Sequence, residues 1–188
     1  FVSNSGEVVI DGISYHVLLG DFHMHTTYSD GRNSPIEMVL KSRELGYDFI
    51  AITDHGKIQG AIQAKGDVEK YGINLIVIVG EEATTDWGHL LALRISQVIS
   101  QNMEPNETCK AIHDQDGYAI PAHPLGYWNE SVFKSLMEGH QVDAYEAYNG
   151  GDNCTPDALS ATPIAAQYPI VADSDAHNAV NLGSATTI

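Results

Sequence analysis

Basic residues are scarce in this chain: nine Lys and Arg stand against 25 Asp and Glu, for a formal net charge of −16 over 188 residues. A field of this sign repels a nucleic-acid backbone, and the sequence has no basic stripe to offset it. Bound cations would make the electrostatic field positive only in their immediate surroundings. The composition therefore argues against a primary role in binding duplex nucleic acid.

Long apolar runs are also missing. No stretch approaches the roughly 20 apolar residues that a membrane-spanning helix needs, and the start of the chain has no basic segment of the kind that opens a signal peptide. We therefore expect no membrane partner, and a cytoplasmic location is favoured. The first residue is Phe1 rather than Met, which leaves open an exported form whose signal has already been removed.

Three further absences narrow the chemistry. Cys109 and Cys154 are the only cysteines, and their separation fits no metal-binding or redox motif, so a single disulfide is neither required nor excluded. The chain lacks a glycine-rich phosphate-binding loop and a serine in a nucleophile-elbow pattern. These absences disfavour phosphate-loop enzymes and serine hydrolases.

What is present is the composition of one globular domain, with 43% hydrophobic residues. The first 17 residues predict a hairpin, because Asp11-Gly12 suits a two-residue turn between apolar segments. The remaining residues, 18–188, are expected to form a single domain. Ser34, Pro35 and Glu37 predict the start of its first helix, through an N-cap, a proline at the first position and a capping box.

Apolar strands then alternate with helices along the chain. We expect further helices near 58–72, 105–116, 130–138 and 156–167, and strands near 49–52, 75–79, 89–93, 118–122, 142–148 and 170–172. Strands that are apolar on both faces and separated by helices indicate a parallel α/β architecture. About seven strands come close to closing a barrel.

Histidines and carboxylates gather where these strands end. His23 and His25 follow an apolar run and, two residues apart on an extended chain, project to the same face. Asp175 and His177 repeat that spacing after the last strand. Asp30 comes five residues after His25, and further strand-end motifs supply His55, Glu82, His89 and His123. Because barrels of this kind carry their active site at the C-terminal end of the strands, we expect a metal site there.

Neighbouring residues leave some roles open. Glu81 competes with Glu82 as the bridging carboxylate, and periodicity alone does not separate them. Asp54 either orients the imidazole of His55 or satisfies its own loop. Arg32 and Lys57 each follow a motif loop, where they either contact an anionic substrate group or are solvated loop charges.

The motifs together resemble the PHP (polymerase and histidinol phosphatase) superfamily. The segments that carry the resemblance are residues 20–31, Thr53-Asp54-His55, Gly80-Glu81-Glu82, His89, His123-Pro124 and Ser174-Asp175-Ala176-His177. Residues 20–31 are similar to the short metal-dependent phosphoesterases. Residues 145–150 and 174–178, with Gly183 and Thr186, resemble the branch that contains aryl-carbamate hydrolases.

The resemblance implies a distorted (β/α)7 barrel of PHP type that holds two or three divalent metal ions, Mn, Fe or Zn. One ion would take His23, His25, Glu82 and Asp175. A second would share Glu82 and add His89 and His123, and a third would take Asp30, His55 and His177. The family pattern Gly-x-Glu favours Glu82 over Glu81. Asp30 stands where the family often has His, and this harder ligand leans toward Mn or Fe without excluding Zn.

From these residues we predict a metal-dependent hydrolase, foremost a phosphoesterase that acts on a small phosphate ester or nucleotide through metal-bound hydroxide. Asp175 and His177 are the catalytic candidates, with Asp175 assisting proton transfer to the leaving group. One alternative is hydrolysis of a carboxylic or carbamic ester at the same centre. The other is a non-catalytic, metal-stabilised domain of a larger assembly. The natural substrate and the oligomeric state are not readable from the sequence.

Overall fold

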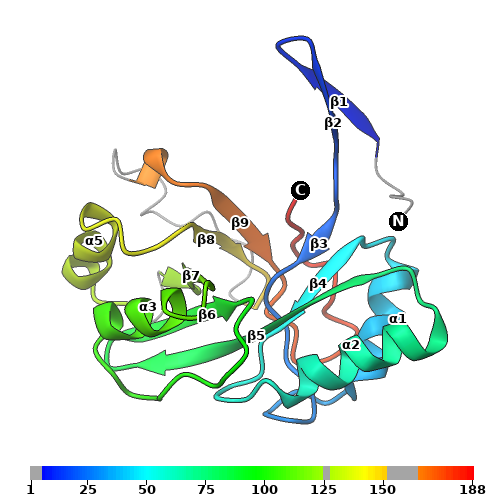
Figure 1. Ribbon diagram of the computed structural model, residues 1–188, viewed down its shortest axis with the longest axis horizontal. Helices are drawn as coiled ribbons and strands as arrows, with labels where there is room; N and C mark the ends of the chain where they lie inside the picture. Colours follow the sequence, from blue (N-terminus) through cyan, green and yellow to red (C-terminus); the bar gives the residue numbers. More distant parts are fainter. Residues whose placement is uncertain (1–5, 125–127, 152–164) are drawn as a thin grey trace.

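The computed structural model describes residues 6–124, 128–151 and 165–188 and is built on a five-stranded sheet in the order β3-β4-β5-β6-β7 (Figure 1). The strands are β3 (Gly20–Asp21), β4 (Phe49–Ile52), β5 (Ile76–Thr85), β6 (Gly88–Leu93) and β7 (Tyr118–Pro121). The first three run parallel to one another. Helices α1 (Pro35–Glu44) and α2 (Gln59–Tyr71) pack against β4 and β5 (Figure 1).

A second parallel pair, β8 (Tyr145–Asn149) and β9 (Ile170–Asp173), curls beside this sheet. It meets β7 where the Asp143 backbone N–H donates to the Ala119 carbonyl (3.0 Å), and it meets the end of β3 where the His25 N–H donates to the Ala176 carbonyl (3.0 Å). The α/β class that we expected is confirmed. Among the described residues, however, the strand ladders form separate sheets, so a fully closed seven-stranded barrel is not confirmed.

The parallel order that we expected throughout the sheet is wrong for β6. This strand runs antiparallel to both β5 and β7. Only residues 86–87 separate β5 from β6, and a two-residue link can join antiparallel strands, whereas parallel strands need a crossover of a dozen residues or more. Consequently, the start of β6 lies beside the end of β5.

The helix predictions hold where local signals were clear. At the start of α1 the Glu37 carboxylate accepts hydrogen bonds from the Ser34 N–H and hydroxyl, both 2.7 Å. Helix α5 (Glu130–Glu138) has its expected bounds, and α3 (Pro105–His113) is shorter than expected. The helix expected at 156–167 lies mostly outside the described residues, and its described end is a 3-10 turn, η2 (Ala165–Gln167).

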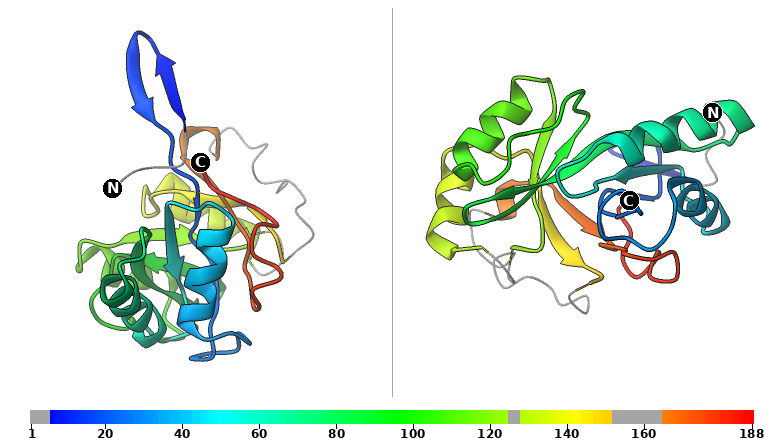
Figure 2. Two further views of the ribbon diagram at one scale, coloured as in Figure 1. Left: turned by 90° about the vertical axis from the view of Figure 1, so that its right-hand side faces the viewer. Right: turned by 90° about the horizontal axis from the view of Figure 1, so that it is seen from below.

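The N-terminal hairpin forms as predicted from β1 (Glu7–Ile10) and β2 (Ile13–His16). Asp11 (φ 50°) and Gly12 (φ 80°) both adopt the left-handed region, as a type I′ turn requires. All eight strand residues are exposed, and the hairpin projects away from the rest of the molecule (Figure 2).

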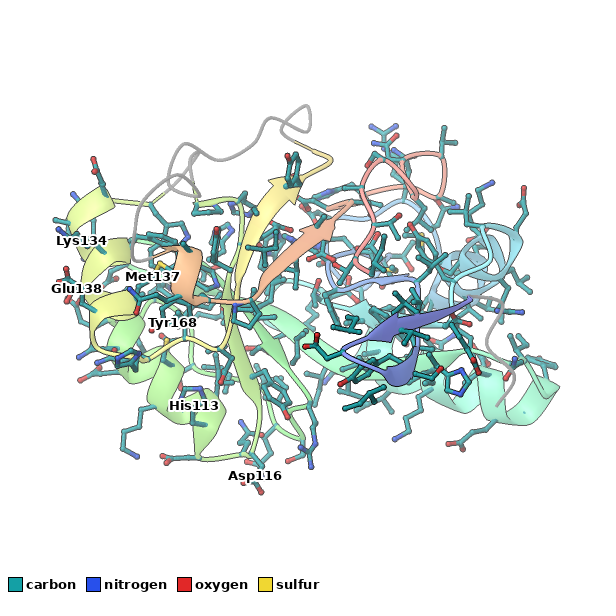
Figure 3. All side chains as sticks on the ribbon, turned by 90° about the horizontal axis from the view of Figure 1, so that it is seen from above. His113, Asp116, Lys134, Met137, Glu138 and Tyr168 are labelled. Atoms are coloured by element: carbon teal, nitrogen blue, oxygen red, sulfur yellow. The ribbon has the colours of Figure 1, made fainter. Side chains whose placement is uncertain are left out.

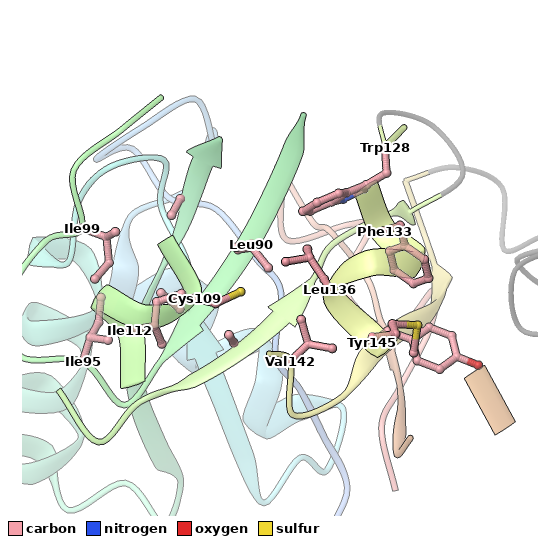
Figure 4. Packing of buried hydrophobic residues seen from close by; sticks show 14 of the residues in the cluster. Leu90, Ile95, Ile99, Cys109, Ile112, Trp128, Phe133, Leu136, Val142 and Tyr145 are labelled. Carbon is pink, nitrogen blue, oxygen red and sulfur yellow. The ribbon is translucent and has the colours of Figure 1, made fainter. Parts of the chain in front are cut away.

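The largest cluster of buried hydrophobic residues lies between the sheet and helices α3 and α5 (Figure 4). Leu90, Ile112 and Phe133 are its fully buried anchors. Cys109 on α3 is a free, buried thiol in the same cluster, while Cys154 falls outside the described residues. No helix in the described part of the chain combines the length and apolar character that a membrane crossing requires.

Candidate metal centre

One cluster contains all nine predicted ligands, at the end of the sheet where β3, β4 and β5 finish and β6 begins. His23 and His25 follow β3 and are completely buried. Glu82 does not follow a strand end as expected, because β5 continues through it to Thr85. His89 lies near the start of β6 rather than at its end, and the antiparallel direction of that strand brings it to the cluster.

Glu82 occupies the middle of the cluster and divides its two oxygens between two groups of histidines. Its Oε1 lies 2.7 Å from His89 Nδ1 and 2.8 Å from His123 Nε2. Its Oε2 lies 3.2 Å from both His23 Nε2 and His25 Nε2, and 3.4 Å from His55 Nδ1. A carboxylate held in this way has the geometry to bridge two ions.

The ligand atoms around His23 and His25 are spaced as ligands of a shared cation would be. The two Nε2 atoms are 3.2 Å apart, and Asp175 Oδ1 lies 3.3 Å from one and 3.2 Å from the other. Bonds of about 2.1 Å in a tetrahedral arrangement place ligand atoms about 3.4 Å apart. Asp175 Oδ1 is moreover buried without a hydrogen-bond partner, as expected of an oxygen reserved for a cation.

Asp30 belongs to a separate, more exposed part of the cluster. Its Oδ2 lies 3.2 Å from His177 Nε2 and 3.8 Å from His55 Nε2, and its Oδ1 lies 3.6 Å from His25 Nδ1. His177 Nδ1 donates to the Asp175 carbonyl (3.0 Å), so in the neutral ring the Nε2 lone pair faces a carboxylate oxygen. Two acceptors that face each other need a proton or a metal cation between them.

The cluster therefore offers four sets of converging ligand atoms, which partly match the sets implied by the family resemblance. The four sets are His25, Asp30, His55 and His177; His23, His25 and Asp175; His23, Glu82 and His123; and His55, Glu82 and His89. His25 joins the Asp30 set in addition to its expected place. Imidazole and carboxylate ligands in such numbers fit divalent transition metals, so the residues present fit the group that the resemblance implies.

Electrostatics in the cluster favour charge pairs. Burial lowers the pKa of His25, but Asp175 and Glu82 outweigh it and raise that pKa to about 9. Burial likewise lowers the pKa of His23, and the carboxylates of Asp175, Glu82 and Glu146 raise it well above its usual range. Burial raises the pKa of Glu82, yet the surrounding histidines hold it well below its usual value. Without a metal, protons must therefore hold these groups together.

The loop that presents Asp30 is organised by Asp54. Its carboxylate accepts hydrogen bonds from the Thr26 N–H (2.7 Å), the Thr26 hydroxyl (2.7 Å) and the Ser29 hydroxyl (2.6 Å). Of the two roles considered for Asp54, the structure thus shows it satisfying the loop. Gly60 is needed beside it, because a Cβ there would lie 2.2 Å from Asp54 Oδ2.

Two residues on β8 that the sequence did not assign lie directly behind the ligands. Glu146 Oε1 lies 3.0 Å from His23 Nδ1, and Asn149 Nδ2 donates to Glu146 Oε2 (2.9 Å) and to Asp175 Oδ2 (3.2 Å). Their segment was noted only for its family resemblance. The signal available in the sequence was the presence of two polar residues, Glu146 and Asn149, in and directly after a predicted strand.

The remaining candidates differ in their surroundings. Glu81 points away from the cluster, and its Oε1 accepts from the Ile99 N–H (2.9 Å). The Lys57 ammonium donates to the Tyr28 carbonyl. Arg32 is joined to the cluster through its backbone, whose N–H donates to the His177 carbonyl (2.8 Å).

Comparison with known proteins agrees with this geometry. A family model described as "PHP domain" matches residues 21–162. An uncharacterized protein of Methanocaldococcus jannaschii is 28% identical over 144 residues, which cover 69% of this chain and 82% of that protein. A 5'-3' exoribonuclease of Haemophilus influenzae is 39% identical over 104 residues, which cover 53% of this chain and 37% of the exoribonuclease.

Among solved structures, a two-domain protein of Bacteroides vulgatus that contains a predicted PHP-like metal-dependent phosphoesterase matches with a TM-score of 0.74. The match covers 96% of this chain and 58% of the other, at 21% sequence identity. The likeness therefore supports the fold, and this chain spans little more than half the length of that protein.

Proposed function

Since the chain belongs to the PHP domain family, we propose that it is a metal-dependent hydrolase, and specifically a phosphoesterase for a small phosphate ester or nucleotide. The observation that carries the proposal is the set of carboxylate oxygens and imidazole nitrogens that converge around Glu82 at 2.7–3.4 Å. Such a group is costly to bury unless cations bind to it.

Divalent ions in such a centre supply an activated water and stabilise negative charge on the reacting group. The residues of the chain would hold the ions in place. Glu82 divides its oxygens between the two histidine groups, and Asp175 directs Oδ1 toward His23 and His25. Asp175 is 15% exposed at its side chain, so its carboxylate could take up the proton that the attacking water releases and pass it to a leaving group at the rim. His177, at 38%, is the second candidate for that step.

The substrate is proposed from two lines of support. The Haemophilus relative is named an exoribonuclease and the Bacteroides structure contains a predicted phosphoesterase, and both names describe cleavage of phosphate esters. The net charge of −16 disfavours a long duplex but does not oppose a short nucleotide whose phosphate sits on metal ions. Arg32 and Lys57, near the exposed rim of the centre, remain the proposed contacts for an anionic substrate.

The test is a substrate panel with the protein loaded with Mn²⁺ or Zn²⁺. It compares p-nitrophenyl phosphate, bis(p-nitrophenyl) phosphate, a dinucleotide and p-nitrophenyl acetate, with Asp175→Asn as the control that separates enzyme turnover from free metal. We expect turnover of a phosphate ester that Asp175→Asn abolishes. Preferential turnover of the acetate would favour the carboxylic or carbamic ester alternative, and thermal stabilisation by metal without any turnover would favour a non-catalytic domain.

A further inference from the structure

We propose that Glu146 is a positioning residue that fixes the tautomer of His23, and that Asn149 ties this carboxylate to Asp175. The inference rests on the proposed function only in requiring that the cluster binds metal. It gives a role to the segment at 145–150, which the proposed chemistry leaves without one.

A bulge in β8 makes the arrangement possible. Side chains three residues apart on a regular strand point to opposite faces, yet Glu146 and Asn149 are both buried and bonded to each other. The pairing of β8 with β9 shifts between Glu146 and Tyr148, so that Glu146 pairs with Val171 and Tyr148 with Ala172. The extra residue turns Asn149 to the same side as Glu146, as bulges near functional sites often do.

Every polar contact that the structure gives the Glu146 side chain comes from a group that can donate. Oε1 faces His23 Nδ1 at 3.0 Å, while Oε2 accepts from the His123 backbone N–H and from Asn149 Nδ2. An ionised carboxylate meets this requirement because it only accepts. In the neutral ring that a metal would bind, the hydrogen of His23 therefore lies on Nδ1.

The consequence appears on the other side of the ring. With the hydrogen on Nδ1, the lone pair of His23 Nε2 faces Glu82 Oε2 at 3.2 Å and Asp175 Oδ1 at 3.3 Å. Only this tautomer lets Nε2 bind a metal, and hydrogen bonds from the far nitrogen commonly fix histidine ligands in this way.

Asn149 extends the support to a second ligand. Its Oδ1 accepts from the Gly151 N–H (2.8 Å), which leaves Nδ2 to donate to Glu146 and to Asp175 Oδ2. Asp175 is thereby held through one oxygen while the other, Oδ1, faces the two histidines. One strand thus orients His23, Asp175 and the backbone at His123 together.

The test compares Glu146→Gln with Glu146→Ala. Gln has the shape of Glu but only one accepting oxygen. If its NH2 group faces His23, it donates to Nδ1 and places the ring hydrogen on Nε2. If its NH2 group faces His123 and Asn149 instead, it meets their N–H groups, which then have no acceptor. If Glu146 acts by accepting, both variants lose Zn²⁺ affinity by about 10–100-fold. If it only fills space, Gln retains the affinity and Ala alone loses it, which would overturn the proposal.

Affinity is measured by titrating Zn²⁺ into metal-free protein against a chromophoric chelator. The matched control is Glu138→Gln on α5, at the outer edge of the molecule beside Lys134 (Figure 3), which should bind Zn²⁺ as the unchanged protein does. Failure of the unchanged protein to bind Zn²⁺ would contradict the proposed function, whereas equal binding by Glu146→Gln would contradict this inference alone.

A second measurement needs no variant and so does not depend on folding of the substituted proteins. Long-range ¹H–¹⁵N correlation spectra of the Zn²⁺-loaded protein report which ring nitrogen of each histidine carries hydrogen. We expect the His23 ring to carry hydrogen on Nδ1. Hydrogen on Nε2 in the unchanged protein would refute the proposal.

Discussion

Glu82 Oε1 and His89 Nδ1 lie 2.7 Å apart across the β5–β6 hairpin. The two residues share one short antiparallel turn, so the hairpin alone fixes their relative positions. The same carboxylate reaches His23 and His25 through its other oxygen, which makes Glu82 the residue common to both halves of the centre.

Replacing Glu82 by Gln should therefore lower the metal content and reduce activity by roughly 100-fold or more, because the proposed metal centre would supply several kcal/mol of charge stabilisation. Metal content is measured by elemental analysis and activity with the phosphate ester that the panel selects. The control is Glu81→Gln: burial raises the pKa of Glu81 to about 7, and its side chain points elsewhere. Loss of metal from the Glu81 variant, with Glu82→Gln unaffected, would reverse the assignment.

Asp30 should control one ion without the others. It lies with His177 and His55 rather than beside Glu82, so Asp30→Asn is expected to lower the metal content by part of the total, while His23→Ala lowers it further. Elemental analysis after dialysis reports both values. A protein that keeps its full metal content without the Asp30 carboxylate would show that Asp30 is not a ligand.

Metal binding should release protons. In the metal-free protein the carboxylates hold the pKa of His25 at about 9, so at pH 8 the ring is mostly charged and must lose its proton to bind metal. The apparent affinity should fall by roughly tenfold per pH unit below 9 for one such proton. Calorimetric titration with Zn²⁺ at pH 8 in two buffers of different ionisation enthalpy measures the release, and identical heats in both buffers would contradict it.

Two glycines of α2 should respond to alanine in opposite directions. A Cβ at Gly60 would lie 2.2 Å from Asp54 Oδ2 and 2.8 Å from Thr26 Oγ1, so Gly60→Ala should destabilise the protein by about 1–3 kcal/mol. Gly66 has nothing within 4 Å of that position, so Gly66→Ala should stabilise it by about 0.5–1 kcal/mol. Denaturant unfolding measures both, and equal effects would show that the Asp54 loop tolerates the methyl group.

Cys109 should be unreactive in the folded protein. Burial in the core raises the pKa of its thiol to about 12, and the thiolate is the reactive form. In a Cys154→Ser background, 5,5′-dithiobis(2-nitrobenzoate) at pH 8 is expected to label Cys109 only after denaturation. Rapid labelling of the native protein would indicate that the cluster around α3 opens easily.

Local signals in the sequence predicted local structure well. Ser34 and Glu37 fixed the start of α1, and Asp11-Gly12 fixed the hairpin, because each motif satisfies its own backbone. Among the apolar residues of α1, by contrast, Leu40 is 55% exposed, while Met38 is buried. Which face of the helix packs is decided by β4 and α2 rather than by the helix itself.

The candidate site was predictable as a set of residues but not as an arrangement. The end of β5 was placed before Gly80 because glycine and two glutamates usually interrupt strands, whereas the ladder with β6 carries the strand through both glutamates. Glu146 was missed because its contact with His23 spans 123 positions of sequence. Such a contact becomes visible only when β8 is placed behind β3.

The sharing of one carboxylate by two histidine groups makes metal loading a coupled process. An ion bound beside His89 and His123 would fix the orientation of Glu82 for a second ion beside His23 and His25, and by thermodynamic reciprocity the second ion would have the same effect on the first. Filling of the centre should then be cooperative, so that at low metal supply the population divides between empty and fully loaded molecules rather than accumulating half-loaded ones.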